Sequence, residues 1–401
     1  MDPESRANSG AAPEGLPAPP AGAAEHSRRL AEALRAEIAA AGGAITFQRF
    51  MELALHAPGL GYYSAGSRKL GAEGDFVTAP ELSPLFARTL AAPCRAALAR
   101  LGQGSILEVG AGSGALAAGV LAELAALEAL PEEYLILEIS AELRERQAQT
   151  LRERDPALAA RVRWVEALPE GFRGVVLANE LLDAMPVHRF EMSDAGVRES
   201  YVVSAAEGFA WRAGEPSTPA LVERVRAIEA ALGAPLPAGY TSEVNFAAEH
   251  WVRGLGECLE AGLVLLIDYG FGRGEYYHPQ RHMGTLMCHY RHRAHGDPLI
   301  LVGLQDITAH VDFTAIAEAA DAAGLSVAGY TTQAHFLLGS GLGELAQAAG
   351  GDPAEQLRVA NEVKRLTLPH EMGELFKVMG LTRGLDLQLP GFLLQDMRHR
   401  L

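Results

Sequence analysis

The sequence has few of the features that mark secreted, membrane-spanning or nucleic-acid-binding proteins. Its 401 residues include only 3 cysteines, widely separated and without a C-x-x-C pair, which argues against a disulfide framework and a cysteine zinc site. No apolar run approaches the roughly 18 residues of a membrane-spanning helix. A net charge of -16 offers no basic surface for phosphate backbones. We therefore expect a protein of a reducing cytoplasm with neither membrane nor nucleic acid as its partner.

The composition is otherwise that of a globular chain. Hydrophobic residues make up 49% of it, enough for one large domain with an insertion or a smaller companion. Residues 1–25 are rich in Pro, Gly, Ala and Ser and lack aromatic side chains, so we expect this segment to be disordered. It resembles neither a signal peptide nor a transit peptide, which favours a bacterial cytoplasmic protein.

The most informative stretch of the chain is residues 105–116, Ser-Ile-Leu-Glu-Val-Gly-Ala-Gly-Ser-Gly-Ala-Leu. A short apolar run predicts a buried strand, and the alanine-rich residues 116–130 have helical spacing. Between them, Gly110, Gly112 and Gly114 allow a tight turn in which a ligand can lie directly on the backbone. The sequence predicts a strand, a glycine turn and a helix.

The ligand of this turn is open to more than one interpretation. Gly110, Gly112 and Ala115 also satisfy the dinucleotide fingerprint G-x-G-x-x-A, and a turn without ligand is the third reading. Glu108 precedes the first glycine, and its negative charge would oppose a phosphate but suit a sulfonium or ammonium group. We therefore favour a cationic nucleoside ligand.

Polar side chains follow the next predicted strands. Glu138 closes the strand expected at 134–139, where an acid can accept hydrogen bonds from both ribose hydroxyls, and Glu166 follows the strand at 162–165 as a weaker candidate for the adenine edge. Asn179 and Glu180 come directly after the strand at 174–178. Polar groups buried there without hydrogen-bond partners would cost free energy. Asn179 could equally cap a following helix.

The remaining segments are expected as follows: helices at 27–41, 45–55, from about 78 to 101, 221–232, 240–259 and 314–323; hairpins within 187–211; a strand at 262–267; mostly helix in 344–379; and final strands near 325–329 and 392–394. Asp75 and Thr78 precede the helix that ends near 101. Thr78 and Glu81 have capping-box spacing, so the pair Asp75 and Thr78 serves either as a helix cap or as a lid over the ligand.

A metal site is not expected. His289, His292 and His295 repeat every third residue, but Arg291 and Arg293 lie between them and no acidic pair completes a site of known spacing. We interpret these histidines as hydrogen-bonding groups.

These patterns divide the chain into consecutive segments: a tail at 1–25, an N-terminal helical lid at 26–100, a first core part at 101–186, an inserted substrate arm at 187–237, a second core part at 238–335, and a C-terminal helical region with the last strand at 336–401.

Several motifs resemble the MidA family of class I S-adenosylmethionine methyltransferases. They are Gly61-Tyr62-Tyr63, Gly74-Asp75-Phe76-Val77-Thr78-Ala79-Pro80-Glu81, the glycine turn with Glu108, Asn179-Glu180-Leu181-Leu182-Asp183-Ala184-Met185-Pro186-Val187, Asp268-Tyr269-Gly270 and Asp306-Ile307-Thr308-Ala309-His310-Val311-Asp312-Phe313. The resemblance covers residues 44–379.

The resemblance implies an α/β fold, Rossmann-like, with a mostly parallel sheet, helices on both faces, an N-terminal helical lid and an inserted α+β arm. It implies S-adenosylmethionine as cofactor and an arginine of a partner protein as methyl acceptor, because mitochondrial members are protein arginine methyltransferases that assist respiratory complex I assembly. By position, the cofactor-binding residues would be Glu108, Gly110, Gly112, Gly114, Glu138 and Asn179, with Asp75 and Thr78 closing over the cofactor.

A guanidinium stays protonated near neutral pH, so an enzyme can orient it between carboxylates. Glu180, with Asp183 or Glu243, is the expected clamp. Two rival functions remain at this point: an NAD(P)-dependent oxidoreductase, and a non-catalytic assembly factor that only binds S-adenosylmethionine. The sequence is also compatible with a homodimer.

Overall fold

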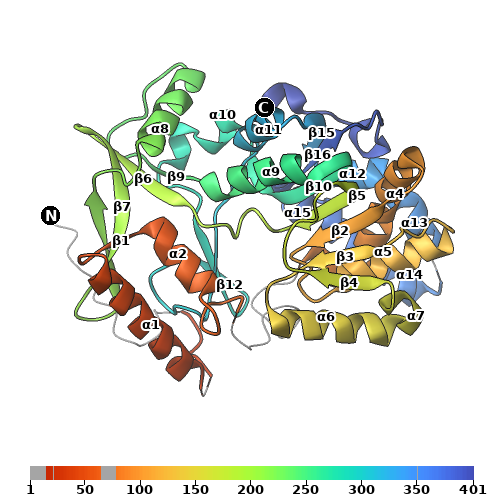
Figure 1. Ribbon diagram of the computed structural model, residues 1–401, viewed down its shortest axis with the longest axis horizontal. Helices are drawn as coiled ribbons and strands as arrows, with labels where there is room; N and C mark the ends of the chain where they lie inside the picture. The colour runs from red at the N-terminus through yellow and green to blue at the C-terminus, as the bar shows by residue number, and fades with distance from the viewer. Residues whose placement is uncertain (1–14, 21, 65–77, 350) are drawn as a thin grey trace. The chain divides into compact units, whose positions relative to one another are not determined.

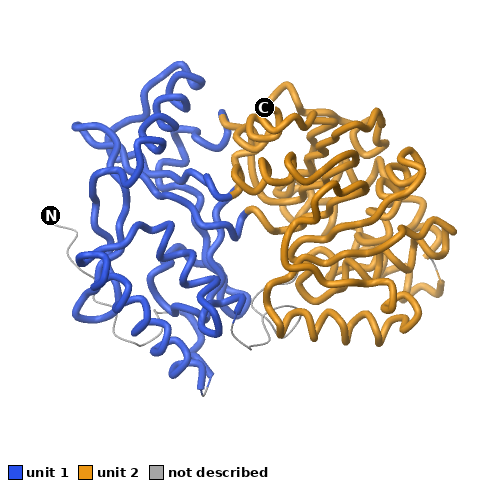
Figure 2. The backbone as a smooth tube through the Cα atoms, in the orientation of Figure 1, with its two compact units in different colours: residues 1–76, 183–247, 274–310 blue, residues 77–182, 248–273, 311–401 orange. Residues whose placement is uncertain are grey.

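The computed structural model describes residues 15–20, 22–64, 78–349 and 351–401. The chain forms two compact units, each built from segments far apart in the sequence (Figure 2). The first unit comprises residues 1–76, 183–247 and 274–310; the second unit comprises residues 77–182, 248–273 and 311–401. The units are therefore discontinuous, whereas the segments expected from the sequence are consecutive.

The second unit contains a mostly parallel sheet of 8 strands in the order β15-β16-β10-β5-β2-β3-β4, with β14 beside β10 (Figure 1). Only β16 runs antiparallel, to both of its neighbours. The strands are β2 (Ser105–Val109), β3 (Tyr134–Leu137), β4 (Val162–Val165), β5 (Phe172–Asn179), β10 (Leu259–Phe271), β14 (Val311–Asp312), β15 (Ser326–Thr332) and β16 (Phe376–Arg383). This sheet confirms the predicted fold class.

Helices cover this sheet. They are α3 (Ala79–Leu82), α4 (Pro84–Leu101), α5 (Ala115–Ala126), α6 (Ala141–Arg154), α7 (Pro156–Ala159), most of α9 (Phe246–Cys258), α11 (Phe313–Ala322), α12 (Gln333–Gly339), α13 (Leu342–Ala348), α14 (Pro353–Thr367) and α15 (Met372–Leu375). The apolar sides of α4 and α5 form one buried cluster with side chains of β2, β3, β5, β10 and β16. Removal of this surface from water is the main term that stabilises the unit.

The first unit has an antiparallel sheet in the order β1-β7-β6-β9, with β8 beside β7, and a three-stranded sheet in the order β12-β11-β13. Its elements are α1 (Ala23–Ala40), β1 (Ile45–Thr46), α2 (Phe47–His56), β6 (His188–Ser193), β7 (Gly196–Ser204), β8 (Phe209–Gly214), α8 (Pro219–Leu232), β9 (Thr241–Val244), β11 (Met287–Tyr290), β12 (Arg293–His295) and β13 (Asp306–Thr308). The segment expected as an arm thus supplies β6, β7, β8 and α8.

Two N-terminal expectations differ from the structure. Helix α1 begins at Ala23, inside the segment expected to be disordered. The single helix expected up to residue 101 is divided into α3 and α4, because Ser83 has extended backbone (φ -151°, ψ 126°) before Pro84. A residue that precedes proline is disfavoured in helical conformation, and the Ser83 hydroxyl instead caps α4 through the Leu85 N–H.

Three further expectations differ from the structure. Residues 241–244 form β9 rather than the start of a helix, and the last strand is β16, inside a region expected to be mostly helical. Phe392 belongs to a short 3-10 helix, Pro390–Phe392, instead of a strand. β16 is buried at seven consecutive positions between two antiparallel neighbours, so its apolar run lacks the alternation that distinguishes a strand from a buried helix.

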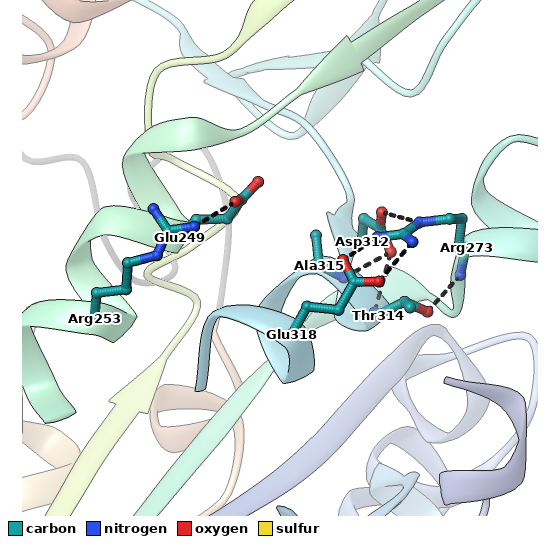
Figure 3. A network of polar contacts seen from close by, with 7 residues as sticks. All are labelled: Glu249, Arg253, Arg273, Asp312, Thr314, Ala315 and Glu318. Atoms are coloured by element: carbon teal, nitrogen blue, oxygen red, sulfur yellow. Dashed lines mark hydrogen bonds and ion pairs between the residues drawn. The ribbon is translucent and has the colours of Figure 1, made fainter. Parts of the chain in front are cut away.

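An ion-pair network fixes the beginning of α11 in the second unit (Figure 3). The Arg273 guanidinium donates to both carboxylate oxygens of Glu318, at 2.7 and 2.6 Å, and lies 3.5 Å from Asp312. Asp312 caps α11 by accepting from the Thr314 and Ala315 N–H groups. Figure 3 also shows the separate pair Arg253–Glu249 on α9. Arg273 therefore joins the end of β10 to α11.

We expect Arg273→Met to lower the free energy of unfolding by about 1–3 kcal/mol, because it removes charged hydrogen bonds from a side chain that is only 10% exposed. Arg152→Met is the matched control, since its ion pair with Glu145 lies at the surface and should contribute at most about 1 kcal/mol. Urea unfolding followed by circular dichroism measures both. Equal small shifts in the two variants would contradict the stabilising role of Arg273.

Candidate active site at the topological switch point

The order in which the chain adds strands to the sheet of the second unit reverses between β2 and β5. From β2 the chain continues to β3 and β4 on one side, whereas β5 and β10 lie on the other. In such sheets ligands bind in the crevice beyond the carboxyl ends of the two central strands. Val109 is in register with both Ala178 of β5 and Leu137 of β3, so these three strands end level. The residues that follow them, Gly110, Glu138 and Glu180, belong to the same edge of the sheet.

The glycine turn has the backbone that the sequence predicts. Gly110, Gly112 and Gly114 have φ of 70°, 53° and 84°, the left-handed region that favours glycine. A Cβ atom on Gly110 would lie 3.2 Å from Leu181, and one on Gly114 would lie 3.1 Å from the Cα atom of Gln147. The turn is therefore packed between the loop after β5 and helix α6, with its backbone available to a ligand.

Glu138 follows β3 and is 7% exposed. One carboxylate oxygen accepts the Ser140 N–H at 2.9 Å, and the other accepts Nε2 of Gln147 at 3.1 Å. Burial raises the pKa of Glu138, and these hydrogen bonds oppose that shift. The Ile139 N–H is a third donor to this carboxylate, so two ribose hydroxyls would share its oxygens with these protein donors. Its neighbour Ile139 is 70% exposed and presents an apolar side chain beside it.

Glu108 occupies a different environment from the expected one. It is 3% exposed and accepts the Tyr134 hydroxyl at 2.6 Å, close to Cys94 of α4. Burial raises the pKa of Glu108 to about 7. The contact assigns Glu108 a role in joining β2 to β3, and cofactor binding by this residue stays a prediction. Glu166 is 83% exposed and pairs with Arg144 at the surface.

Glu180 is held at the end of β5 in an unusual conformation, with φ of 51°. Such a backbone is uncommon for a residue with a Cβ atom and is often found at functional sites. The Glu180 N–H donates to the Ile267 carbonyl at 2.9 Å, and Asp268 accepts the Leu182 N–H at 2.8 Å. These bonds from β10 fix the loop that carries Glu180.

The Glu180 carboxylate accepts Nδ2 of Asn179 at 3.1 Å, the Tyr269 hydroxyl at 3.3 Å and the Ala79 N–H. Burial, followed by the negative charge of Asp268, raises the pKa of Glu180 to about 8. The Oδ1 atom of Asn179 is shielded from solvent and has no hydrogen-bond partner among the described residues. Asn179 therefore offers a ligand one hydrogen-bond acceptor, and Glu180 offers a carboxyl group whose ionised form a bound cation would favour.

The structure does not support a helix-cap role for Asn179, whereas Thr78 does occupy an N-cap position. No helix begins within the described residues 180–187. Thr78 has the N-cap position of α3, but within the described part of the chain its side chain makes no capping hydrogen bond. Its neighbour Ala79 contacts Glu180, which connects the start of α3 with the site. Asp75 lies outside the described residues.

Asp183 and Glu243 belong to the first unit. The carbonyl of Asp183 accepts the Ala309 N–H at 2.9 Å, and its side chain is 3% exposed. Glu243 is fully buried and accepts both the N–H and the hydroxyl of Thr285, at 2.8 and 3.0 Å. The structure therefore groups Glu180 with the predicted cofactor residues, and gives Glu243 contacts that hold a loop of its own unit.

Three residues near Glu138 and Glu180 had no role assigned from the sequence. Asp268 and Tyr269 lie in β10 directly after Ile267, which is paired with Asn179 of β5, so the polar signal that identified Asn179 could have identified them. Gln147 lies in the charged helix α6, whose sequence resembles an ordinary solvated helix. No pattern in the sequence marks Gln147 as buried.

The side chains at this edge fit an S-adenosylmethionine-type nucleoside. Glu138 matches two ribose hydroxyls, Asn179 supplies an acceptor for an ammonium group, and the first turn of α5 supplies N–H donors for a carboxylate. Within the described ranges, no cluster of three or more His, Cys, Asp or Glu side chains has the arrangement of a metal site. None of the helices there is long and apolar enough to span a membrane.

Comparisons with known proteins identify the family of this chain. The model of a family described as "Putative S-adenosyl-L-methionine-dependent methyltransferase" matches residues 86–331. The Drosophila melanogaster protein arginine methyltransferase NDUFAF7 homolog, mitochondrial, is 30% identical over 386 residues, which cover 88% of this chain and 85% of that protein. The Homo sapiens protein arginine methyltransferase NDUFAF7, mitochondrial, is 26% identical over 381 residues, with 84% and 80% covered.

A crystal structure from Burkholderia thailandensis, bound to S-adenosyl-homocysteine, superposes with a TM-score of 0.91 at 48% identity and covers 96% of this chain and 100% of that one. These matches favour a methyltransferase over a nicotinamide oxidoreductase. The matched family model spans more than half of the chain, and the Drosophila relative reaches 30% identity over 88% of it. This chain belongs to the MidA family of S-adenosyl-L-methionine-dependent methyltransferases, and S-adenosylmethionine is its cofactor.

Proposed function

We propose that this enzyme transfers a methyl group from S-adenosylmethionine to an arginine side chain of a partner protein, and that a subunit of respiratory complex I is such a partner. The relatives at 26–30% identity carry the name protein arginine methyltransferase, which supports the class of substrate. The complex I subunit follows from the family resemblance. The observation that carries the proposal is the Glu180 carboxyl group at the end of β5, beside the cofactor edge.

Glu180 has the chemistry that a guanidinium requires. A carboxylate and a guanidinium form a directed, charge-assisted pair, and such a pair can orient one guanidinium nitrogen toward the methyl group of the cofactor. The left-handed backbone and the bonds from Tyr269 and Asn179 hold the carboxyl group in one position. Positioning of this kind can lower the barrier by several kcal/mol, up to about 7–11 for ideal geometry.

The cofactor supplies an electrophilic methyl group on its sulfonium sulfur. Transfer breaks the bond between carbon and sulfur, whose electron pair stays on the sulfur of S-adenosylhomocysteine. It forms a bond between carbon and nitrogen, and the proton displaced from that nitrogen passes to water. Glu138 and the glycine turn bind and orient the cofactor, whereas Glu180 binds the guanidinium. The parts of Asp183 and Glu243 in the clamp stay predictions from the sequence. Thr285 bonds one carboxylate oxygen of Glu243, Oε2.

Glu180→Gln should reduce methyl transfer at least about a hundredfold, because the amide cannot pair with the guanidinium as an anion does. Affinity for S-adenosylhomocysteine should stay within about twofold of wild type, since Glu180 does not hold the cofactor in this proposal. The assay incubates enzyme and labelled cofactor with lysate of a strain that lacks the gene, followed by mass spectrometry of labelled residues. Glu145→Gln is the control, because its side chain is exposed at the surface, where it pairs with Arg152.

Unchanged transfer by Glu180→Gln would remove Glu180 from the clamp. Label recovered on lysine or histidine, with none on arginine, would overturn the proposed substrate class.

The pH dependence provides an independent prediction. A group whose pKa is about 8 is mostly protonated at pH 7, and only its ionised form pairs with a guanidinium. We therefore expect kcat/KM to rise with pH up to about 8 and then level off, with a slope near tenfold per pH unit on the acidic side. Initial rates from pH 6 to pH 9 test this. A wild-type profile that is flat across this range would contradict the role of Glu180 ionisation.

A further inference from the structure

Gln147 connects three parts of the cofactor site from inside α6. Its Nε2 atom donates to the Gly112 carbonyl at 3.1 Å and to the Glu138 carboxylate at 3.1 Å. Its Oε1 atom accepts the indole N–H of Trp164, on β4, at 2.8 Å. The Gln147 side chain is fully buried, so its hydrogen bonds are made within the protein.

These contacts fix the orientation of the amide group. Rotating the amide by half a turn would place its oxygen against the Gly112 carbonyl and the Glu138 carboxylate, and its amino group against the Trp164 N–H. Each of these pairs is repulsive because acceptor would face acceptor and donor would face donor. Buried polar groups that lose their partners are costly, so the arrangement is strongly preferred. Gln147 therefore has one stable orientation.

The backbone of α6 adds a second constraint on the same turn. A Cβ atom on Gly114 would lie 3.1 Å from the Cα atom and 3.3 Å from the carbonyl oxygen of Gln147. Helix α6 thus approaches the glycine turn directly at the position where Gln147 bonds Gly112. Gln147 alone therefore contacts both the glycine turn and the Glu138 carboxylate, the two groups assigned to the cofactor.

We propose that Gln147 is the positioning residue that sets the Glu138 carboxylate for the ribose hydroxyls and holds it in register with the glycine turn. The inference rests on the proposed role of Glu138 in ribose binding. Gln147 does not touch the cofactor in this proposal and acts through Glu138 and Gly112. Trp164 completes its hydrogen bonds, so the indole reports whether the Gln147 amide is in place.

The test compares Gln147→Met, Glu138→Gln and the double variant in full-length protein. Methionine has a similar shape but offers neither donor nor strong acceptor. Titration calorimetry measures the affinity for S-adenosylhomocysteine and for its analogue without the two ribose hydroxyls. Gln149→Met is the matched control, because Gln149 lies on the same helix with its side chain bonded to Glu153 at the surface.

We expect Gln147→Met to weaken S-adenosylhomocysteine binding by about tenfold to a hundredfold, because the loss of a hydrogen bond to a charged group typically has an effect of this size. Affinity for the analogue should change much less, since it lacks the hydroxyls that Glu138 would accept. In the double variant the two effects should not add, because both changes act through one carboxylate. Fluorescence of Trp164, measured with Trp211→Phe and Trp251→Phe, should shift in Gln147→Met and stay unchanged in Gln149→Met.

Wild-type affinity in Gln147→Met, together with weak binding by Glu138→Gln, would overturn this inference and leave the role of Glu138 intact. Equal loss of affinity for both nucleosides would show a general structural role and would also overturn it. Unchanged binding by Glu138→Gln would instead refute the ribose-binding assignment on which the inference rests.

Discussion

The parallel pairing of β2 with β5 is the constraint on which the site depends. Its register, from Ser105 with Gly174 to Val109 with Ala178, makes the two strands end level although they are far apart in the sequence. The chain continues to opposite sides of the sheet after these strands, and in sheets of this topology ligands bind beyond the carboxyl ends of such a strand pair. The glycine turn follows β2, and Asn179 and Glu180 follow β5. A shift of either strand along the other would separate the cofactor turn from the proposed clamp.

Burial decides the charge state of the acids at this edge. Glu108 and Glu180 have pKa values raised to about 7 and about 8, because few water molecules can stabilise their charges. Glu138 has a smaller shift, since the Ser140 N–H and Gln147 stabilise its ionised form. Three glutamates at the ends of neighbouring strands thus differ in chemistry. Glu138 suits neutral hydroxyl donors, whereas Glu180 suits a cation that would favour its ionisation.

Much of this architecture could be predicted from local patterns. The glycine turn, the strands around it and the acid after β3 depend on short-range backbone geometry and burial, which the sequence displays directly. The environment of Glu108 could not be predicted from its closeness in sequence to the glycine turn. Alternation along a strand places it on the same side of the sheet as Ile106, near α4, although it is only two residues from the turn.

Other features depend on long-range contacts that the sequence does not display. β16 lies between two antiparallel neighbours, and its burial on both faces removes the alternation expected of a strand. Gln147 lies in a helix rich in charged residues, and only the approach of α6 to the glycine turn buries it. The discontinuous units depend in the same way on segments that meet only after folding.

The central claim is that the switch-point edge holds the cofactor, with its ribose on Glu138 and its amino-acid portion along the glycine turn. A crystal structure of this chain with S-adenosylhomocysteine tests it most directly. The account predicts both ribose hydroxyls within hydrogen-bond distance of the Glu138 carboxylate and the homocysteine beside Gly110, Gly112 and Gly114. A ribose held by other residues, with the Glu138 carboxylate bonded only to groups of the protein itself, would contradict this placement of the cofactor.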